Sequence, residues 1–223
     1  MSQGVAIVGR SGTGKSTSIR TLDPQTTVII QALPKSLPFK GWNSSYSKEQ
    51  RNLIRTHKWD KVKAYVLDIG ANRPEIKTII LDDIGYVMGR EMMDRAMENG
   101  YDRFTEIAFH FYQIMTSIDG LRDDLQVVFM FHEDTDDSIL RGPNRKIKVH
   151  GKMIEKTFSP EEVFTVVLYT DTITDPETLA TEYVFVTNRT SIYPAKSPLG
   201  MFEEIHVPND LNVVLDKITE YSN

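Results

Sequence analysis

Short apolar runs alternate with longer amphipathic stretches along the first two thirds of the chain, and this alternation predicts its elements. Four continuous apolar runs predict strands that are buried on both faces, at residues 4–8, 26–32, 76–81 and 126–132. Apolar positions at helical spacing predict helices over residues 15–22, 47–69, 88–98 and 102–119. Because strands and helices alternate, we expect an α/β fold with a mostly parallel sheet and helical crossovers.

The pattern changes after residue 160. Residues 163–170 and 181–188 read as two strands joined by the turn-rich link TDPET, which predicts an antiparallel hairpin added to the sheet. Apolar positions at helical spacing predict a last helix over residues 210–221. We therefore expect one domain over residues 1–223, with a core at 1–160 and a hairpin and helix at 161–223.

Composition narrows the class of protein. The chain has 223 residues, of which 40% are hydrophobic and 26% are charged, and its net charge is −5. The absence of cysteine excludes zinc fingers, iron–sulfur sites, thiol nucleophiles and disulfides. No apolar stretch approaches the roughly 18 residues of a membrane span, and the N-terminal sequence lacks a signal-peptide pattern. We expect a cytoplasmic protein with no membrane partner.

The segment GRSGTGKS at residues 9–16 matches the phosphate-binding loop pattern G-x-x-x-x-G-K-[ST]. A predicted strand precedes it and a predicted helix follows, which is the context that the motif requires. Its backbone amides would surround a phosphate at the positive end of a helix dipole. Lys15 would contact the β- and γ-phosphates, and the Ser16 hydroxyl would bind Mg²⁺. The expected nucleotide-binding residues are Gly9, Arg10, Ser11, Gly12, Thr13, Gly14, Lys15, Ser16 and Thr17.

Polar side chains follow two of the predicted buried strands. Asp82 and Asp83 end the run TIILDD, where Asp82 would hold Mg²⁺ through water and Asp83 would polarise the attacking water. The alternative is a pair of carboxylates that caps a turn, and two adjacent carboxylates also repel each other. His132 ends the strand at 126–132, where it would either contact the γ-phosphate or serve only as a hydrogen-bonded residue at a strand end.

Two basic segments are candidates for contact with nucleic acid. Residues 138–154 contain no acid and carry Arg141, Arg145, Lys146, Lys148 and Lys152. Glycine and proline mark this segment as a flexible loop, which would contact DNA, cover a phosphate substrate or be merely solvated. Residues 35–63 combine eight basic residues with aromatic ones, as single-stranded nucleic acid requires. The alternative there is a solvated helix face whose aromatic rings lie in the core.

The order of several stretches resembles a known family. These stretches are GRSGTGKS (9–16), LPFKGW (37–42), IKTIILDDIGYVMGREMMDRA (76–96), NGYDRFTEIA (99–108), FMFHED (129–134), PAKSPLGMF (194–202) and PNDL (208–211). In these stretches the chain resembles the phage-encoded, single-domain RecA-like P-loop ATPases, a group that includes single-strand annealing and recombination proteins. The resemblance implies a RecA-like core, binding of ATP with Mg²⁺, assembly into rings or filaments, and action on phage DNA in the host cytoplasm.

The same resemblance assigns roles to individual residues. It implies nucleotide and metal roles for Lys15, Ser16 and Asp82, a γ-phosphate sensor at His132, and a cation at Lys196 that reaches the γ-phosphate of a neighbouring subunit. One departure concerns the catalytic glutamate that follows the second strand in RecA-type proteins, because this chain has Gln31 and no acid there. Either Asp83 replaces it or hydrolysis is slow.

Three functional hypotheses follow from these observations. The first is a DNA-dependent ATPase that serves phage recombination or single-strand annealing, with single-stranded DNA and phage single-strand binding or replication proteins as partners. The second is a nucleotide or small-molecule kinase in which residues 138–154 form an arginine-bearing lid. The third is an adaptor or assembly protein that binds ATP with little turnover.

Overall fold

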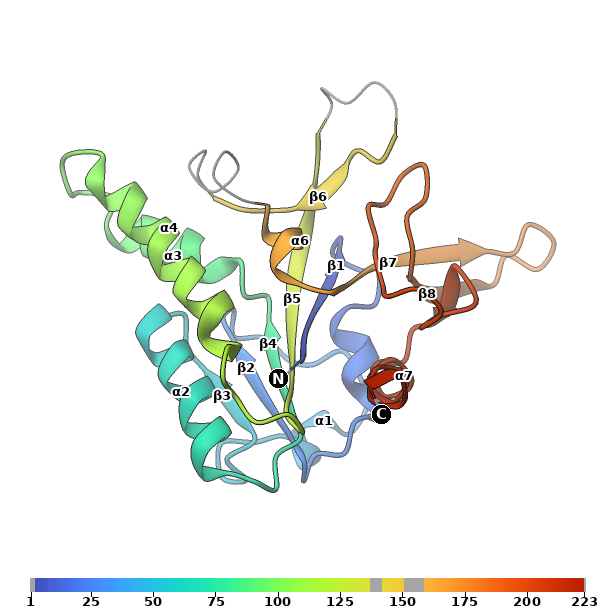
Figure 1. Ribbon diagram of the computed structural model, residues 1–223, viewed down its shortest axis with the longest axis horizontal. Coiled ribbons are helices and arrows are strands. Elements are labelled where there is room, and N and C mark those ends of the chain that lie inside the picture. The colour runs from blue at the N-terminus through green and yellow to red at the C-terminus, as the bar shows by residue number, and fades with distance from the viewer. Residues whose placement is uncertain (1–2, 137–141, 151–158, 223) are drawn as a thin grey trace.

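The computed structural model describes residues 3–136, 142–150 and 159–222. Within these residues the chain forms one nine-stranded, mostly parallel sheet with helices on both faces (Figure 1). The strands are β1 (Gln3–Gly9), β2 (Thr27–Gln31), β3 (Leu53–Arg55), β4 (Thr78–Asp82), β5 (Gln126–Thr135), β6 (Arg145–Ile147), β7 (Val166–Thr174), β8 (Thr181–Val186) and β9 (His206–Pro208). The sheet order is β3-β2-β4-β5-β1-β7-β8-β9, with β6 paired to β5.

Helices complete three layers. They are η1 (Ser16–Thr21), α1 (Trp42–Ser45), α2 (Trp59–Asn72), α3 (Tyr86–Asp94), α4 (Asp102–Met115), η2 (Thr116–Ile118), α6 (Pro160–Val163) and α7 (Leu211–Ser222). In Figure 1, α2, α3 and α4 lie to the left of the sheet, and α7 lies to its right. None of the helices within the described ranges is long and apolar enough to cross a membrane.

The parallel strands are buried because both faces of the sheet are covered. Alternate residues of β1 enter the two cores: Ala6 and Val8 pack on the side of α2 and α4, whereas Val5 and Ile7 pack on the side of η1 and α7. Strands β3, β2, β4, β5, β1 and β7 pair in parallel, and β7 pairs with β8 in antiparallel register. The expected α/β fold, with a mostly parallel sheet and an antiparallel C-terminal hairpin, is confirmed.

The expected continuous helix over residues 47–69 is wrong in its first half. Residues Leu53–Arg55 instead form β3, which pairs with Ile29–Gln31 at the edge of the sheet, and the helix begins only at Trp59. Arg51 adopts a φ of +58°, which stops a helix from passing through this point. The Asn52 side chain donates hydrogen bonds to the carbonyls of Pro24 and Ser45 and holds the turn.

Within the basic segment after β5, residues 145–147 form a strand where a flexible loop is expected. Strand β5 continues three residues beyond His132 and pairs with β6 in antiparallel register, so that Glu133 lies opposite Ile147. Arg145 and Lys146 therefore belong to a strand, and Lys148 follows it directly. Arg141 and Lys152 lie outside the described residues.

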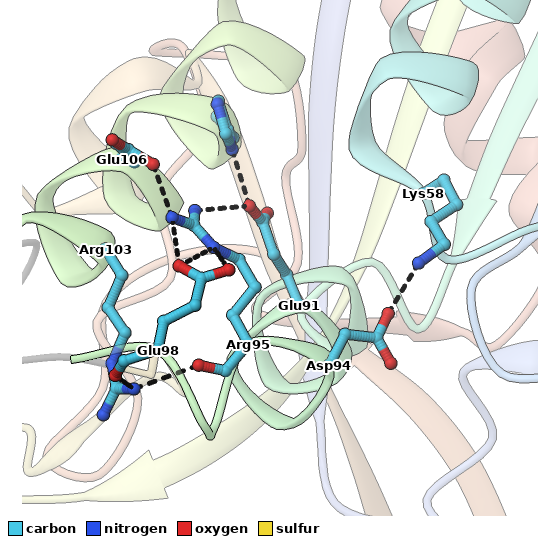
Figure 2. Close-up of polar contacts among 8 residues, drawn as sticks. Lys58, Glu91, Asp94, Arg95, Glu98, Arg103 and Glu106 are labelled. Atoms are coloured by element: carbon cyan, nitrogen blue, oxygen red, sulfur yellow. Dashed lines mark hydrogen bonds and ion pairs between the residues drawn. The ribbon is translucent and has the colours of Figure 1, made fainter.

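Ion pairs rather than a core hold the far end of the α3–α4 pair. Figure 2 shows Arg95 of the α3 C-terminus between three carboxylates. Its guanidinium lies 3.4 Å from Glu91, 2.7 Å from Glu98 and 2.6 Å from Glu106. Exposed ion pairs contribute little stability individually. Arg95, however, contacts three carboxylates at once and is only 21% exposed, so these pairs form a network that joins the end of α3 to α4.

Candidate functional site

The phosphate loop connects β1 to η1, and its glycines are required by contacts and backbone geometry. A Cβ atom on Gly9 would lie 1.9 Å from Oγ1 of Thr170, and one on Gly14 would lie 3.0 Å from the Asn209 side chain. Gly14 also has a φ of +99°, which side chains rarely allow. The following helix is the 3₁₀ helix η1 rather than a regular α-helix. The loop is thus pressed closely against β7 and the start of α7.

Lys15 lies beneath this loop and is only 6% exposed. Its ammonium donates hydrogen bonds to the carbonyl oxygens of Gly9 at 2.7 Å and Arg10 at 3.0 Å. Burial lowers the pKa of Lys15, and the charge of Asp83 opposes that shift. Two neutral carbonyl oxygens therefore hold the Lys15 ammonium at the loop. A phosphate oxygen would take their place and accept a stronger, charge-assisted hydrogen bond.

Ser16 and Asp82 meet under the loop, as the sequence predicts. The Ser16 hydroxyl donates to Oδ1 of Asp82 at 3.0 Å, and the Gln31 amide donates to Oδ2 at 3.1 Å. Burial and then the neighbouring charge of Asp83 raise the pKa of Asp82. A hydroxyl and a carboxylate are oxygen ligands of the kind that Mg²⁺ takes together with substrate phosphates. Residues Ser16 and Asp82 therefore fit the expected metal.

Asp83 lies next to Asp82 in the sequence but faces a different set of partners. It is buried at a φ of +55°, it accepts a hydrogen bond from Lys35, and its Oδ1 lies 3.1 Å from Nε2 of His132. Burial acts to raise the pKa of Asp83, but the contacts with His132 and Lys35 outweigh it and lower the pKa to about 2. So weak a base suits an anchor for Lys35 and His132 better than the activation of water. The predicted role in water activation stays a prediction.

His132 reaches the same edge of the sheet, beside the phosphate loop. The register pairs it with Gly9, the first residue of the loop. The ring of Tyr86 packs edge-on against the imidazole, with 5.6 Å between the ring centres. The imidazole is thus fixed between Asp83 and an aromatic ring while it faces the cleft. This position suits contact with a terminal phosphate, which stays a prediction.

A cleft of about 430 Å³ lies over these groups. Its walls combine the predicted residues Arg10, Ser11, Gly12, Gly14, Lys15, Ser16, Thr17 and His132 with Lys35, Ser36, Pro38 and Tyr183. Lys196 does not join them, because its backbone pairs with Val167 at the sheet edge and its side chain is exposed. Its predicted reach into a neighbouring subunit stays a prediction.

Glu133 is a site residue that the sequence analysis missed. Its buried carboxylate lies 2.6 Å from Nε of Arg10 in the phosphate loop and 3.7 Å from Nη1 of Arg145 in β6. Burial raises the pKa of Glu133, and the charge of Arg10 opposes that shift. The backbone amide of Lys148 donates to the carbonyl of His132 at 2.8 Å. The basic strand is therefore bonded directly to the edge of the nucleotide cleft.

The aromatic residues of the second basic segment do not form an exposed stacking surface. Tyr46 is only 2% exposed, and Phe39 and Trp42 pack against the core beside η1 and α7. Trp59 stacks on His110 with 3.9 Å between the ring centres. The rings named therefore lie in or against the core, as the alternative interpretation expected, while contact of the segment's cations with nucleic acid stays a prediction.

Comparisons with known proteins give one family and several similar structures. Residues 1–199 match a family described as AAA domain. No curated protein matches the chain. One similar structure is a KaiC-like protein of the archaeon Pyrococcus horikoshii, at 9% identity and a TM-score of 0.46, with 84% of this chain and 79% of that chain covered. Another is the flagellar accessory protein FlaH of Methanocaldococcus jannaschii, at 16% identity and a TM-score of 0.44, with 87% and 81% covered.

The family match extends over the phosphate loop, Asp82, His132 and the basic strand β6. It therefore includes every group that the geometry places around the cleft except the start of α7. The chain belongs to the AAA domain family and is a nucleotide-binding P-loop ATPase domain of that type.

Proposed function

We propose that this ATPase uses its nucleotide state to control the binding of single-stranded DNA at β6, in phage DNA recombination or single-strand annealing. The observation that carries the proposal is the direct bonding of the basic strand to the cleft. Glu133 contacts Arg10 of the phosphate loop and Arg145 of β6, and the Lys148 amide donates to the His132 carbonyl. A change at the γ-phosphate therefore has a short path to the DNA-binding cations.

ATP would bind with its phosphates in the loop at residues 9–16 and its β- and γ-phosphates against Lys15. Ser16 and Asp82 would hold Mg²⁺, which neutralises the charge that develops on the phosphates. Gln31 supports slow turnover, because it occupies the place of an acid and its amide is already bonded to Asp82. Long-lived ATP-bound and ADP-bound states suit a protein that switches its grip on DNA.

The DNA contact would be made by Arg145, Lys146 and Lys148, together with Arg141 and Lys152. We also propose assembly into a ring or filament, in which the exposed Lys196 approaches the nucleotide of a neighbouring subunit. The phage setting, and single-strand binding or replication proteins as further partners, are supported by the resemblance of the sequence stretches and belong to the same proposal.

The test is fluorescence anisotropy with a labelled dT oligonucleotide, measured with Mg²⁺–ATP, with Mg²⁺–ADP and without nucleotide. We expect about tenfold tighter binding with ATP, and this difference should disappear in Lys15→Ala. Arg145→Ala with Lys148→Ala should weaken binding and reduce the salt slope by about 0.7 for each phosphate that the protein no longer neutralises. The matched control is Lys217→Ala, an exposed cation on α7.

Equal affinity for DNA in all nucleotide states would overturn the proposal that the nucleotide state controls DNA binding. Absence of DNA binding would overturn the proposed function itself. The second candidate is an adaptor with little turnover, which the pairing of Asp83 with Lys35 favours. Sedimentation that shows ATP-dependent assembly, without ATP hydrolysis or DNA binding, would select that candidate. Release of ADP that depends on a phosphate acceptor would instead select the kinase.

A further inference from the structure

A second cleft, of about 500 Å³, lies between the edge strand β3 and helix α2. Four cations from three separate segments converge on it: Lys48, Arg51, Arg55 and Arg73. Asp68 is the one acid among its lining residues in the described part of the chain. This cleft, here called the β3 cleft, shares no residue with the nucleotide cleft.

The positive charge of the β3 cleft is poorly compensated within the protein. Arg73 pairs with Glu75 at 2.9 Å. Lys48, Arg51 and Arg55 have no carboxylate at ion-pair distance among residues 3–136, 142–150 and 159–222. The Asp68 carboxylate already accepts a hydrogen bond from Asn72. Within these ranges, three cations of the lining thus lack an ion-pair partner. Asp68 is the one acid beside them, and the guanidinium of Arg55 lies over the Trp42 ring, 6.0 Å from its centre.

The walls of the β3 cleft strengthen the effect of these charges. Leu53, Ile54 and Ile69 form its apolar side. A cleft lined by one sign of charge with walls of low dielectric focuses the electric field and concentrates ions of opposite charge. Tyr65, which is 39% exposed, adds an aromatic ring to the same lining. Cations with an exposed ring are the combination that binds phosphates and stacks a base.

A chain of hydrogen bonds links this cleft to the metal carboxylate. Nε of Arg55 donates to Oε1 of Gln31 at 3.2 Å, and Nε2 of Gln31 donates to Oδ2 of Asp82 at 3.1 Å. The other oxygen of Asp82 accepts from Ser16 at 3.0 Å. Movement of Arg55 toward an anion would therefore disturb the amide that orients Asp82.

We propose that the β3 cleft is a second nucleic-acid site, which binds a phosphate and a base of a single strand through Lys48, Arg51, Arg55 and Tyr65. Its occupation is transmitted through Arg55 and Gln31 to Asp82 and so alters the affinity for the Mg²⁺-bound nucleotide. The site is separate from β6. It rests on the proposed function only for the choice of single-stranded nucleic acid as the ligand.

The location is tested by photo-crosslinking a 5-iodouracil-containing oligonucleotide to the wild-type protein, followed by trypsin digestion and mass spectrometry. A crosslink in the tryptic peptide of residues 64–77, which contains Tyr65, supports the proposal. Crosslinks confined to the region of β6 would overturn it and leave the proposed function standing. Failure to crosslink or bind at any position would overturn both.

The charges are tested with the double variant Arg51→Gly and Lys48→Gln. Glycine removes the guanidinium and also suits the φ of +58° at residue 51, so folding is not endangered. We expect about tenfold weaker binding of the dT oligonucleotide and a salt slope that is smaller by about 1.4. The control Lys217→Gln should change neither value. Unchanged binding in the double variant would overturn the β3 cleft as a site.

Two further probes identify the source of the phosphate. Competition by millimolar dTMP or inorganic phosphate, lost in the double variant, would show that one free phosphate group suffices. Competition only by oligonucleotides would show that the site requires a strand. Either result supports recognition of a phosphate group by the β3 cleft. Competition that is equal in the wild type and the double variant would count against it.

The link to the metal site is tested with Arg55→Gln by measuring the affinity for a fluorescent ATP analogue at several Mg²⁺ concentrations. In the wild type, the oligonucleotide should shift this affinity about threefold, and the shift should vanish in Arg55→Gln. A shift that persists in the variant would overturn the transmission through Gln31. Because the readout is a coupling between two ligands, a general loss of stability would not imitate it.

Discussion

A buried floor under the phosphate loop consists of Lys15, Ser16, Gln31 and Asp82. A rim that reaches the surface consists of Arg10, Glu133 and Arg145. In the floor, both oxygens of Asp82 are hydrogen-bonded and the residue is fully buried. In the rim, Glu133 is buried but the side chain of Arg10 is 57% exposed. A buried charge that loses its partner is costly, while an exposed cation exchanges partners cheaply.

This difference assigns distinct tasks to the two regions. The floor has one arrangement, which suits the tight binding of a phosphate and a metal. In the rim, Arg10 can pair with either Glu133 or an incoming phosphate, and in the second case Glu133 is left to Arg145 of β6. The rim thus suits the transmission of the nucleotide state. Four substitutions separate the two tasks, and the largest effect is expected in the floor.

Removal of the floor's cation should have the largest effect. Lys15→Ala deletes the charge beneath the loop, and we expect the affinity for ATP to fall about 100-fold, in line with about 2–3 kcal/mol for a charge-assisted contact. Isothermal titration calorimetry measures this loss. The fold should remain, because the lysine's present partners are two carbonyls that water can satisfy. An affinity within threefold of wild type would contradict the placement of the phosphates.

Asp83 should affect stability in a manner that depends on pH. Its pKa of about 2 lies below the usual 3.8, so its stabilising effect is full above pH 4 and is lost as the pH falls toward 2. We expect Asp83→Asn to lower the free energy of unfolding by about 1–2 kcal/mol at pH 7, allowing for the partial exposure of Lys35. Urea denaturation from pH 7 to pH 2 should show the two proteins converging. If the difference in free energy of unfolding between the two proteins stays constant over this pH range, the low pKa of Asp83 is refuted.

Asp82 should show the opposite relation between binding and stability. Burial raises its pKa, so the ionised carboxylate is held in the fold at a cost, and Asp82→Asn relieves that cost. We expect an unchanged or higher melting temperature at pH 7 but a loss of about tenfold in the gain of ATP affinity that Mg²⁺ provides. Thermal denaturation and titrations with and without Mg²⁺ measure both. If the ATP affinity of Asp82→Asn depends on Mg²⁺ as in the wild type, Asp82 does not bind the metal.

The rim should give the smallest effect on binding itself. Glu133→Gln keeps the shape of the side chain but releases Arg10 and Arg145, and we expect ATP affinity to change by less than about threefold because Arg10 is largely exposed. The effect should appear instead in coupling, as a smaller difference in DNA affinity between the ATP and ADP states. Anisotropy in both states measures it, with Glu177→Gln, an exposed acid between β7 and β8, as the control. If Glu133→Gln keeps the full difference in DNA affinity between the ATP and ADP states, Glu133 does not transmit the nucleotide state.

Local patterns account for the parts of the molecule that were predicted correctly. Strands β1, β4 and β5 are continuous apolar runs, and the phosphate loop lies between a strand and a helix, so sequence neighbours alone specify them. The contact of Ser16 with Asp82 follows once Asp82 is placed at the carboxyl end of β4 and Ser16 at the end of the loop that follows the neighbouring strand end of β1. This reasoning requires no knowledge of distant contacts.

Errors arose where pairing across the sheet overrides local preference. Strand β3 has only three residues and exists because it pairs with β2, so a helical pattern concealed it. Strand β6 likewise forms against the extension of β5, within a segment rich in glycine and basic residues. Lys35 and Asp83 are 48 residues apart, and no spacing rule connects them.

The sequence by itself determined the phosphate loop, the place of Asp82 at the end of a buried strand and the alternation of strands and helices, because each depends on residues close together in the chain. Only the tertiary structure decided that Asp83 is held by Lys35 and His132, that Glu133 joins the loop to β6, and that four cations surround the β3 cleft. These contacts depend on which strand ends lie side by side. That arrangement is set by packing of the two cores and not by local propensity.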